Sequence, residues 1–363
     1  MRLQNFSKLQ ASYTMGLQKD GRECIVIVAK GSWTIPQNSK EEPRLITDNP
    51  LEIIEADEYL GEPGLSPLKY ENDFARFKKK CDVIMHSCAY AGTELEAKYV
   101  DVNLSIDDKL NKSIRVHGPR YWESYLGLIS IGESEYFEKQ PIHYGIAYGG
   151  VDSAREDKGK TATYLKNPVG IGYLPNTPRK NIVGQPAPQL ESLKTRINGT
   201  VGNYPALSFG PIAKNYPERL KYAGTYDDYW SKNIRPLLPD DFDERFYQCA
   251  PNDQQMPYIK GGETISLTNL THKSNLNFII PKQKLFMSYM VTSTEEIEIE
   301  AFADTLIIEP EENRFSIVWR GNIPIKNSIH EIDDVIVGEP TKAYYRAKLM
   351  NKTFMVNKGK RVW

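Results

Sequence analysis

The strictest pattern in the sequence is the alternation of polar and apolar residues from Tyr99 to Ile106. Every second residue in this segment is apolar, and these residues are Val100, Val102, Leu104 and Ile106. A strand with one buried face requires this period, because successive side chains of a strand point to opposite sides. Glu296 to Glu300 repeats the pattern with three glutamates, which indicates a second strand with a solvated acidic face. The sequence therefore predicts antiparallel β structure rather than a helical bundle.

Turn signals separate further β-rich runs along the chain. Asp20-Gly21 lies between residues 12–17 and the apolar run 24–29, which predicts a hairpin whose second strand is buried on both faces. Additional strands are expected at 51–56, 83–90, 113–117, 265–270, 276–280, 285–291, 297–302, 305–308 and 315–319. The 39 aromatic residues, with 23 Pro and 25 Gly, suit strands joined by shaped loops. We predict a mainly β fold of antiparallel sheets, sandwich- or barrel-like, with a few short helices and long ordered loops.

Helical signals are few and short. Helices are expected at 226–234 with Thr225 as the cap, at 242–248 with Asp241 as the cap, and at 341–350. The cluster Asp240, Asp241, Asp243 and Glu244 is interpreted as acids at a helix N-terminus rather than as a glycosidase pair. We divide the chain into an N-terminal antiparallel β region (1–144), a Gly/Pro-rich loop region (145–215), a region of short helices followed by antiparallel β (216–350), and a tail (351–363). The loop region is expected to be ordered.

Composition excludes several classes of protein. The 46 basic and 47 acidic side chains give a net charge of −1, whereas a nucleic-acid partner calls for a basic excess. No run of 18 apolar residues occurs, so no membrane partner is expected. The first residues lack the apolar stretch of a secretory signal. The four cysteines show no CxxC pair and are expected to be reduced, which predicts a cytoplasmic protein: Cys24, Cys81, Cys88 and Cys249.

Candidate chemistry is sparse. The histidines are scattered singly, with no HxH or HxxxH spacing, so no metal site is expected: His86, His117, His143, His272 and His330. Neither a P-loop nor a GxGxxG motif is present, and no cofactor is predicted. Ala206 to Gly210 loosely resembles a nucleophile elbow around Ser208, but a loop precedes the serine and Pro211 follows the motif. Lys78-Lys79-Lys80 is interpreted as a solvated helix face.

A binding role fits better, because aromatic side chains on shaped loops offer contact area at low entropic cost. The residues predicted to contact a partner are Tyr148, Tyr173, Tyr226, Trp230, Phe242, Phe246 and Trp319. The basic segment Lys358–Trp363 is interpreted either as a docking tail or as a frayed terminus, with the second favoured.

A series of motifs in a fixed order resembles one known family. The motifs are Arg115-Val116-x-Gly118-x-Arg120-x-Trp122, Tyr148-Gly149-Gly150, Asn167-Pro168-Val169-Gly170, Leu174-Pro175-Asn176, Tyr222 to Asp227 with Trp230, Pro239 to Asp243 with Phe246, Ala250-Pro251-x-Asp253-Gln254, Gly261-Gly262-Glu263, Asp304-Thr305-Leu306 and Val318 to Gly321. This order is similar to the domain-of-unknown-function 2169 family. The resemblance implies an accessory protein of bacterial type VI secretion, which helps load an effector, often one with a PAAR domain, onto the VgrG spike. It implies no catalytic residue, since Gly, Pro, Asp and aromatic residues dominate the motifs and mainly fix loop geometry.

Three functions remain open at this point. The favoured one is a non-enzymatic adaptor or chaperone that covers apolar effector surface with loops 145–215 and the segment 222–262. The second is an effector-associated hydrolase, because Ser208, Asp304 and His330 occur in the Ser–Asp–His order of such enzymes. The third is a structural component of the secreted spike.

Overall fold

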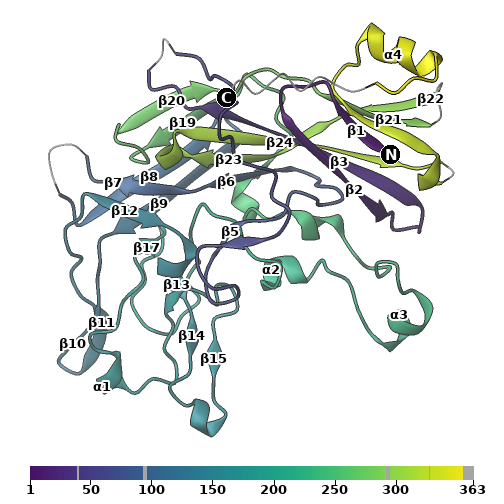
Figure 1. The fold of residues 1–363 in the computed structure, drawn as a ribbon. Coiled ribbons are helices and arrows are strands. Elements are labelled where there is room, and N and C mark those ends of the chain that lie inside the picture. Colours follow the sequence, from purple (N-terminus) through teal and green to yellow (C-terminus); the bar gives the residue numbers. More distant parts are fainter. Residues whose placement is uncertain (39–40, 93–95, 292–294, 327, 355–363) are drawn as a thin grey trace.

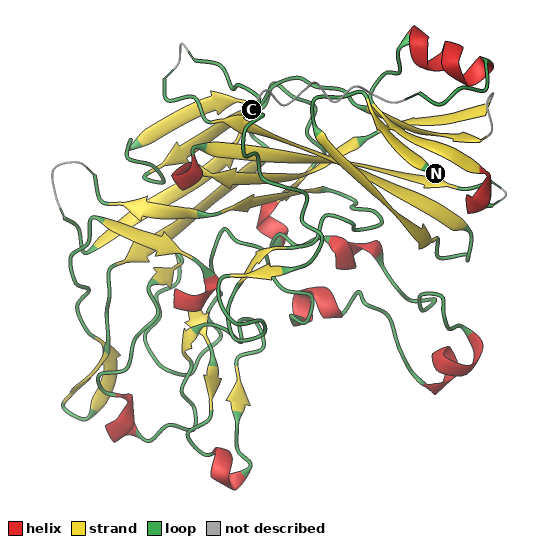
Figure 2. Ribbon diagram, viewed as in Figure 1, coloured by secondary structure: helices red, strands yellow, loops and turns green. Residues whose placement is uncertain are grey.

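The computed structural model describes residues 1–38, 41–92, 96–291, 295–326 and 328–354. Strands dominate the molecule, and short helices lie at its periphery (Figures 1 and 2). Three larger sheets account for most of the strands, and none of the three closes into a barrel. The predicted mainly β class, with mostly antiparallel sheets, a few short helices and long ordered loops, is confirmed.

The largest sheet has six strands and combines segments from both ends of the chain. Antiparallel pairing joins all its neighbours except β6 and β23, which are parallel. Its order is β18 (Gln255–Met256), β6 (Cys81–Met85), β23 (Phe302–Glu309), β24 (Arg314–Pro324), β3 (Glu23–Thr34) and β2 (Gln10–Leu17).

Two further sheets pack on this one. The five-stranded sheet has the order β17 (Leu190–Glu191), β9 (Leu110–His117), β8 (Tyr99–Ile106), β19 (Thr264–Thr268) and β20 (Asn275–Ile279). The four-stranded sheet has the order β1 (Arg2–Asn5), β25 (Ile332–Val337), β21 (Phe286–Val291) and β22 (Glu295–Glu300). The pair β1–β25 is parallel. Strand β25 is absent from the sequence-based expectations.

One hydrophobic core joins the three sheets. Ile27 of β3 and Ile317 of β24 belong to the same buried cluster as Leu104 of β8, Leu267 of β19 and Val335 of β25. Chain segments that the sequence assigns to separate regions therefore share one core. The alternation that predicted β8 is present in the structure, since its even-numbered residues are buried and its odd-numbered residues are more exposed.

The first predicted hairpin is also confirmed. Strands β2 and β3 pair antiparallel, and Gly21 in the connecting turn has a φ of +85°, which favours glycine over residues with a Cβ atom. Residues 24–29 are all buried, because the core covers one face of β3 and the segment around Asp73 and Phe74 covers the other.

Short elements complete the fold. The two-stranded sheets are β4 (Glu58–Tyr59) with β5 (Leu68–Tyr70), β7 (Ser87–Tyr90) with β12 (Lys139–Ile142), β10 (Trp122–Tyr125) with β11 (Leu128–Ile131), β13 (Tyr148–Gly149) with β16 (Ile171–Gly172), and β14 (Val151–Asp152) with β15 (Ala162–Thr163). The α-helices are α1 (Arg179–Ile182), α2 (Pro217–Leu220), α3 (Asp228–Asn233) and α4 (Lys342–Leu349). Short 3₁₀ turns, labelled η, include η3 (Glu244–Tyr247) and η6 (Ile329–Glu331).

Several sequence-based boundaries need correction. Residues 51–56 form no strand, because the N–H of Ile54 donates to the Asp73 carboxylate at 2.8 Å instead of entering a sheet. The cap of α3 is Asp227, which accepts the N–H of Trp230 at 2.8 Å. The predicted cap Thr225 instead donates its hydroxyl to Asp241.

The other two predicted helices differ in outcome. The segment 242–248 contains only the 3₁₀ turn η3, and its cap is Asp243. The helix predicted at 341–350 is present as α4, and Thr341, its predicted first residue, is instead the cap, because its side chain accepts the N–H of Tyr344.

A buried ion pair links β9 to β17 at the border of the loop region. The Glu191 carboxylate accepts from Arg120 Nη2 at 2.9 Å and contacts His117 Nε2 at 3.1 Å. Burial raises the pKa of this carboxyl, but the contacts with His117 and Arg120 outweigh that effect and hold the pKa at about 2. The segment from 118 to 122 is thereby fixed to the edge of the five-stranded sheet.

This ion pair predicts how the free energy of unfolding falls at acidic pH. The Glu191 pKa is lower in the folded state than the 4.5 of the free side chain, so its contribution is complete above pH 4.5 and is lost as the pH falls toward 2. We expect Glu191→Gln to be less stable than wild type at neutral pH, and the difference to shrink by about 3 kcal/mol between pH 5 and pH 2. Urea unfolding at a series of pH values measures it. If the difference in the free energy of unfolding between wild type and Glu191→Gln does not change with pH, the low pKa of Glu191 is contradicted. The exposed Glu339→Gln variant is the control.

Candidate functional site

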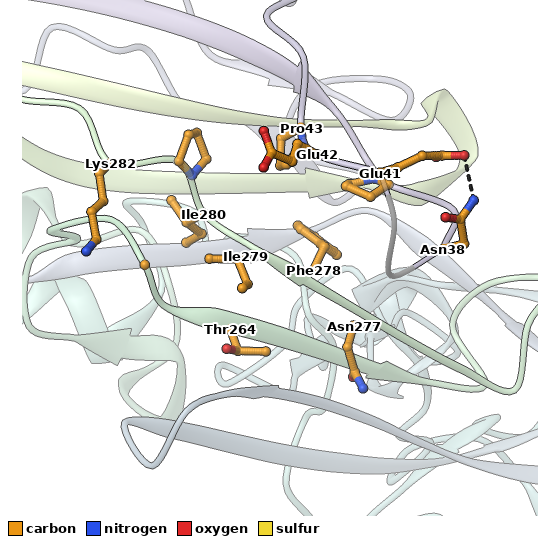
Figure 3. A pocket seen from close by; sticks show the side chains of 13 residues that line it. Asn38, Glu41, Glu42, Pro43, Thr264, Asn277, Phe278, Ile279, Ile280 and Lys282 are labelled. Atoms are coloured by element: carbon orange, nitrogen blue, oxygen red, sulfur yellow. Dashed lines mark hydrogen bonds between the residues drawn. The ribbon is translucent and has the colours of Figure 1, made fainter.

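A groove lies between the loop that follows β3 and the outer strand of the five-stranded sheet. Its volume is about 670 Å³, and its walls are residues 36–43, of which 39–40 are not described, and residues 277–282 (Figure 3). At one end the two walls are tied together, because Lys273 Nζ donates to the backbone oxygen of Gln37. The sequence predicts both walls as a strand and an ordered loop, but gives no sign that they meet.

The groove follows the edge of β20. All six residues from Asn277 to Lys282 line it. Of these, Asn277, Phe278 and Ile279 belong to β20, and because successive side chains of a strand point to opposite faces, a hollow that meets all three reaches the side of the strand. Thr264 of the neighbouring strand β19 lines the groove as well. Strand β20 is the last strand of its sheet. Among the described residues, no strand pairs with its second edge.

The backbone of β20 offers unused hydrogen-bonding groups at this edge. The N–H of Ile280 donates to Glu263 at 2.9 Å, toward β19. In an antiparallel pair the direction of the backbone groups alternates along the strand. The N–H and C=O groups of Asn277 and Ile279 therefore point away from β19 and into the groove.

The lining is apolar with a few charges. Phe278, Ile280 and three prolines supply apolar surface, and Ile279 is 55% exposed. Glu41 and Glu42 lie on the loop wall, while Lys282 lies at the end of the strand wall (Figure 3).

Glu41 is held in its ionised form. Its carboxylate accepts the backbone N–H of Gln37 at 2.9 Å and the side-chain amide of Asn38 at 2.6 Å, and the bond from Gln37 is the main cause that lowers its pKa. The described lining contains no Ser, Cys or His. Such a surface suits the binding of an extended chain.

The seven predicted partner residues lie in different environments, and they do not form one surface. Tyr148, Phe242 and Trp319 are buried. Tyr148 centres an aromatic cluster with Tyr164, Tyr173 and Tyr204. Their contact with a partner stays a prediction, and the buried ones would have to leave the core to make it.

Other predicted residues are more accessible. Tyr226 is 53% exposed, and its ring packs edge-on against Trp230 at 4.7 Å between centroids. Phe246 is half-buried beneath the Arg219 guanidinium. Tyr226 and Trp230 lie on the peripheral segment that carries α3 (Figure 1). Residues 355–363, which include the predicted docking tail, lie outside the described residues.

The hydrolase triad has no contact that would assemble it. Ser208 is fully buried, and its hydroxyl accepts the N–H of Gly210 at 3.2 Å. Asp304 binds Arg320, and His330 lies on η6. No hydrogen bond found in the described part of the chain joins any two of these three residues.

Charged side chains form a buried row on the face of the six-stranded sheet that points away from the core. The row consists of three ion pairs: Lys30 with Asp73, Lys78 with Asp82, and Arg320 with Asp304. All six side chains are buried. Buried charges are tolerated only when they are paired, so the row fastens residues 73–78 to the sheet.

This row corrects the interpretation of Lys78-Lys79-Lys80. The segment is not helical, and Lys78 is buried, while Lys79 and Lys80 are exposed. Burial opposes the charge of Lys78, but the Asp82 carboxylate at 2.8 Å outweighs burial and raises the pKa of the lysine. Its ammonium also donates to Thr305 Oγ1 at 3.0 Å. The motif residues Asp304, Thr305 and Arg320 thus have a structural role.

Motifs of the loop region have a similar task. The side-chain amide of Asn167 donates to the carbonyls of Tyr144 and Tyr148 at 2.9 and 3.1 Å, and the backbone carbonyl of Asn167 accepts the N–H of Gly150. Asn167 therefore fastens the segment before β16 to β13. In the same way, the amide of Gln254 joins β6 to Phe209, because it donates to the carbonyls of Val83 and Phe209 at 2.7 and 2.8 Å.

Three general properties of the described chain bear on the kinds of site that it can hold. No three His, Cys, Asp or Glu side chains gather as potential metal ligands among the described residues, and the absence of a metal or cofactor stays a prediction. The four cysteines are free thiols, as predicted. Within the described ranges, no helix combines the length and the apolar composition needed to cross a bilayer.

Comparison with known proteins gives one result. A search of curated proteins and a search of solved structures each produced no significant match. A family model described as "Uncharacterized protein conserved in bacteria (DUF2169)" matches residues 20–320. That range contains the groove, the buried charge row and, apart from Gly321, all the motif residues that carry the resemblance. The chain therefore belongs to this bacterial family.

Proposed function

We propose that the protein is a non-enzymatic adaptor that binds a type VI secretion effector with a PAAR domain and helps load it onto the VgrG spike. The open edge of β20 beside the groove is the observation that carries the proposal. Family membership supplies the bacterial setting.

The edge of β20 suits the capture of an extended segment of the effector. Such a segment would pair with the N–H and C=O groups of Asn277 and Ile279 and so continue the five-stranded sheet. Main-chain bonds give affinity in this mode of recognition, and the pockets beside the strand give specificity. The apolar side chains of the segment would enter the groove near Phe278 and Ile280.

The charges of the groove restrict the segment further. Glu41 and Glu42 both lie on the loop wall, and the Glu42 carboxylate points away from that of Glu41 (Figure 3), so a Lys or Arg of the effector would meet a carboxylate at either place. Rim charges of this kind contribute mainly to specificity and to the association rate. The favoured ligand is an extended, apolar segment with a basic residue.

The adaptor acts before firing, in the cytoplasm, and this location separates it from a structural part of the spike. An adaptor stays in the cell after the effector has left, whereas a spike component appears in the secreted fraction. Immunoblots of cell and culture fractions from secreting bacteria distinguish the two roles.

The edge can be blocked without disturbing the core. Asn277→Pro removes the N–H that points into the groove and places a ring there. Proline is tolerated on edge strands where the N–H faces outward. We expect the affinity for the purified PAAR-containing effector of the same bacterium to fall at least about tenfold, since one main-chain bond and steric access are both lost. Isothermal titration calorimetry measures the dissociation constant.

The matched control is Asn277→Ala, which keeps the backbone donor and is expected to bind like wild type. Thermal unfolding of both variants confirms that the fold is kept. Equal affinities of the proline variant and wild type would remove the β20 edge from the binding site. Normal effector loading in bacteria that lack the protein would reject the adaptor role itself.

A further inference from the structure

More than half of the exposed large apolar side chains in the described residues fall between residues 121 and 229. The most exposed group among them is the tip of the β10–β11 hairpin. Tyr125, Leu126 and Leu128 are 73%, 87% and 71% exposed. We call Tyr125-Leu126-Gly127-Leu128 the apolar finger. In Figure 1 the hairpin lies at the lower left of the molecule, far from α4.

The turn of the finger contains a residue that its backbone does not favour. Tyr125 pairs with Leu128, so Leu126 and Gly127 form a two-residue loop, with φ angles of +49° and +79°. Such a loop prefers Asn or Asp before glycine, and a bulky residue at positive φ is unusual. Local backbone energy therefore does not explain the leucine. A strained residue that presents a bare apolar side chain to solvent indicates a contact that the isolated chain does not make.

The root of the finger is firmly held. The Trp122 side chain is fully buried in a cluster with Tyr148, Ile182 and, more peripherally, Ile129. The backbone N–H of Trp122 donates to the backbone carbonyl of Gln185 at 2.9 Å, and the backbone carbonyl of Trp122 accepts the N–H of Gly184 at 2.8 Å. From this root the two strands project the tip roughly 10 Å, at about 3.4 Å per residue. A rigid root and an apolar tip lower the entropic cost of insertion.

The surroundings of the finger are acidic. From Tyr121 to Glu138 the chain contains no Lys or Arg, and four glutamates there are exposed: Glu123, Glu133, Glu135 and Glu138. Lys98 pairs with Glu133, which leaves three of the four carboxylates without an ion pair to a described residue. Anionic lipid surfaces attract Lys and Arg and repel this charge. The electrostatics thus favour a protein surface with basic residues.

From these observations we infer that the apolar finger inserts into a hydrophobic pocket with a basic rim on a folded part of the effector. The inference rests on the adaptor function proposed above and adds a second contact to it. Tyr121, just before β10, forms an isolated β-bridge with Pro186, near β17 at one edge of the five-stranded sheet. Strand β20 forms the opposite edge of that sheet. The finger and the groove therefore lie at opposite edges of that sheet, and one effector would contact both.

Leu126→Asn tests the inference, because it should change binding and stability in different directions. Asparagine tolerates the left-handed conformation of this turn, so the thermal midpoint of the variant should equal or exceed that of wild type. The dissociation constant for the purified effector should rise about 10- to 100-fold, as for the loss of a central interface side chain. Leu349→Asn is the matched control, since Leu349 is 75% exposed on α4 and should bind like wild type.

A second variant, Tyr125→Ser with Leu128→Thr, removes the other two apolar side chains and keeps the leucine turn. It should weaken binding by a similar factor. If both variants bind the effector as tightly as wild type does, the finger does not contact the effector. That result would overturn the inference about the finger and leave the adaptor proposal intact. A lower thermal midpoint of Leu126→Asn would assign the leucine a structural role and also overturn it. If wild type fails to bind the effector, both proposals fall.

Sedimentation with vesicles of phosphatidylethanolamine and phosphatidylglycerol tests the competing lipid surface. Wild type should stay in the supernatant. Vesicle binding that Leu126→Asn abolishes would assign the finger to a membrane and overturn the protein pocket.

Discussion

Replacement of Arg320 by methionine is expected to lower the free energy of unfolding by about 3–5 kcal/mol, the usual cost of removing one partner of a buried ion pair. Arg320 donates to both carboxylate oxygens of Asp304, at 2.6 and 3.2 Å, and to the carbonyls of Asp73 and Ala75. Methionine fills much of the same volume but leaves the Asp304 carboxylate buried beside no cation of its own. Urea unfolding monitored by tryptophan fluorescence measures the loss.

The control is Arg22→Met, which breaks the exposed pair of Arg22 with Asp20. Exposed pairs contribute about 0–1 kcal/mol, so this variant should unfold close to wild type. The double variant Arg320→Met with Asp304→Leu should recover part of the loss, because no buried charge remains unpaired. A small loss for Arg320→Met alone would mean that water reaches the charge row.

Gly149→Ala is expected to be the second strongly destabilising change, at roughly 2–5 kcal/mol. Gly149 has a φ of +154°, and an added Cβ would lie 2.1 Å from the backbone oxygen of Asn167. Backbone strain of this kind costs about 1–3 kcal/mol, and overpacking adds a similar amount. The change would push β16 away from β13 and disturb the aromatic cluster around Tyr148.

The matched control is Gly199→Ala in the same region. An added Cβ at Gly199 meets no atom closer than 3.9 Å, and this glycine has no positive φ. Its stability should stay within about 0.5 kcal/mol of wild type. Thermal and urea unfolding of the two variants compare them directly, and equal stabilities would refute the close approach at Gly149.

Local sequence patterns predict the strands well, because the alternation of buried and exposed side chains depends on neighbouring residues. The alternation in 99–106 and the Asp20-Gly21 turn both correspond to strands of the structure. The strand predicted at 51–56 is wrong, because the N–H of Ile54 donates to the side chain of Asp73, 19 residues away. Such a partner leaves no trace in the local pattern.

The candidate site was harder to predict than the fold. The sequence predicts the strand at 276–280, but its place at the edge of a sheet depends on the pairing of its neighbour β19 with β8, more than 150 positions earlier. Lys78 was assigned to solvent because lysines are usually exposed, whereas its partner Thr305 lies 227 residues further along. The Leu126-Gly127 turn is absent from the sequence-based predictions, because leucine before glycine is not a usual turn signal, and the exposure of the turn follows from the buried root at Trp122.

The pairing of the chain's two ends has a consequence for biosynthesis. The N-terminal strand β3 lies between β2 and β24, and β1 pairs with β25. The ribosome therefore releases the first hairpin long before its partners near residues 314–337 exist. Contacts of such long sequence separation form slowly, and a waiting apolar strand is prone to aggregation. We expect the sheets to be completed only after β24 and β25 have left the ribosome, and nascent chains arrested before β24 to depend on general chaperones for their solubility.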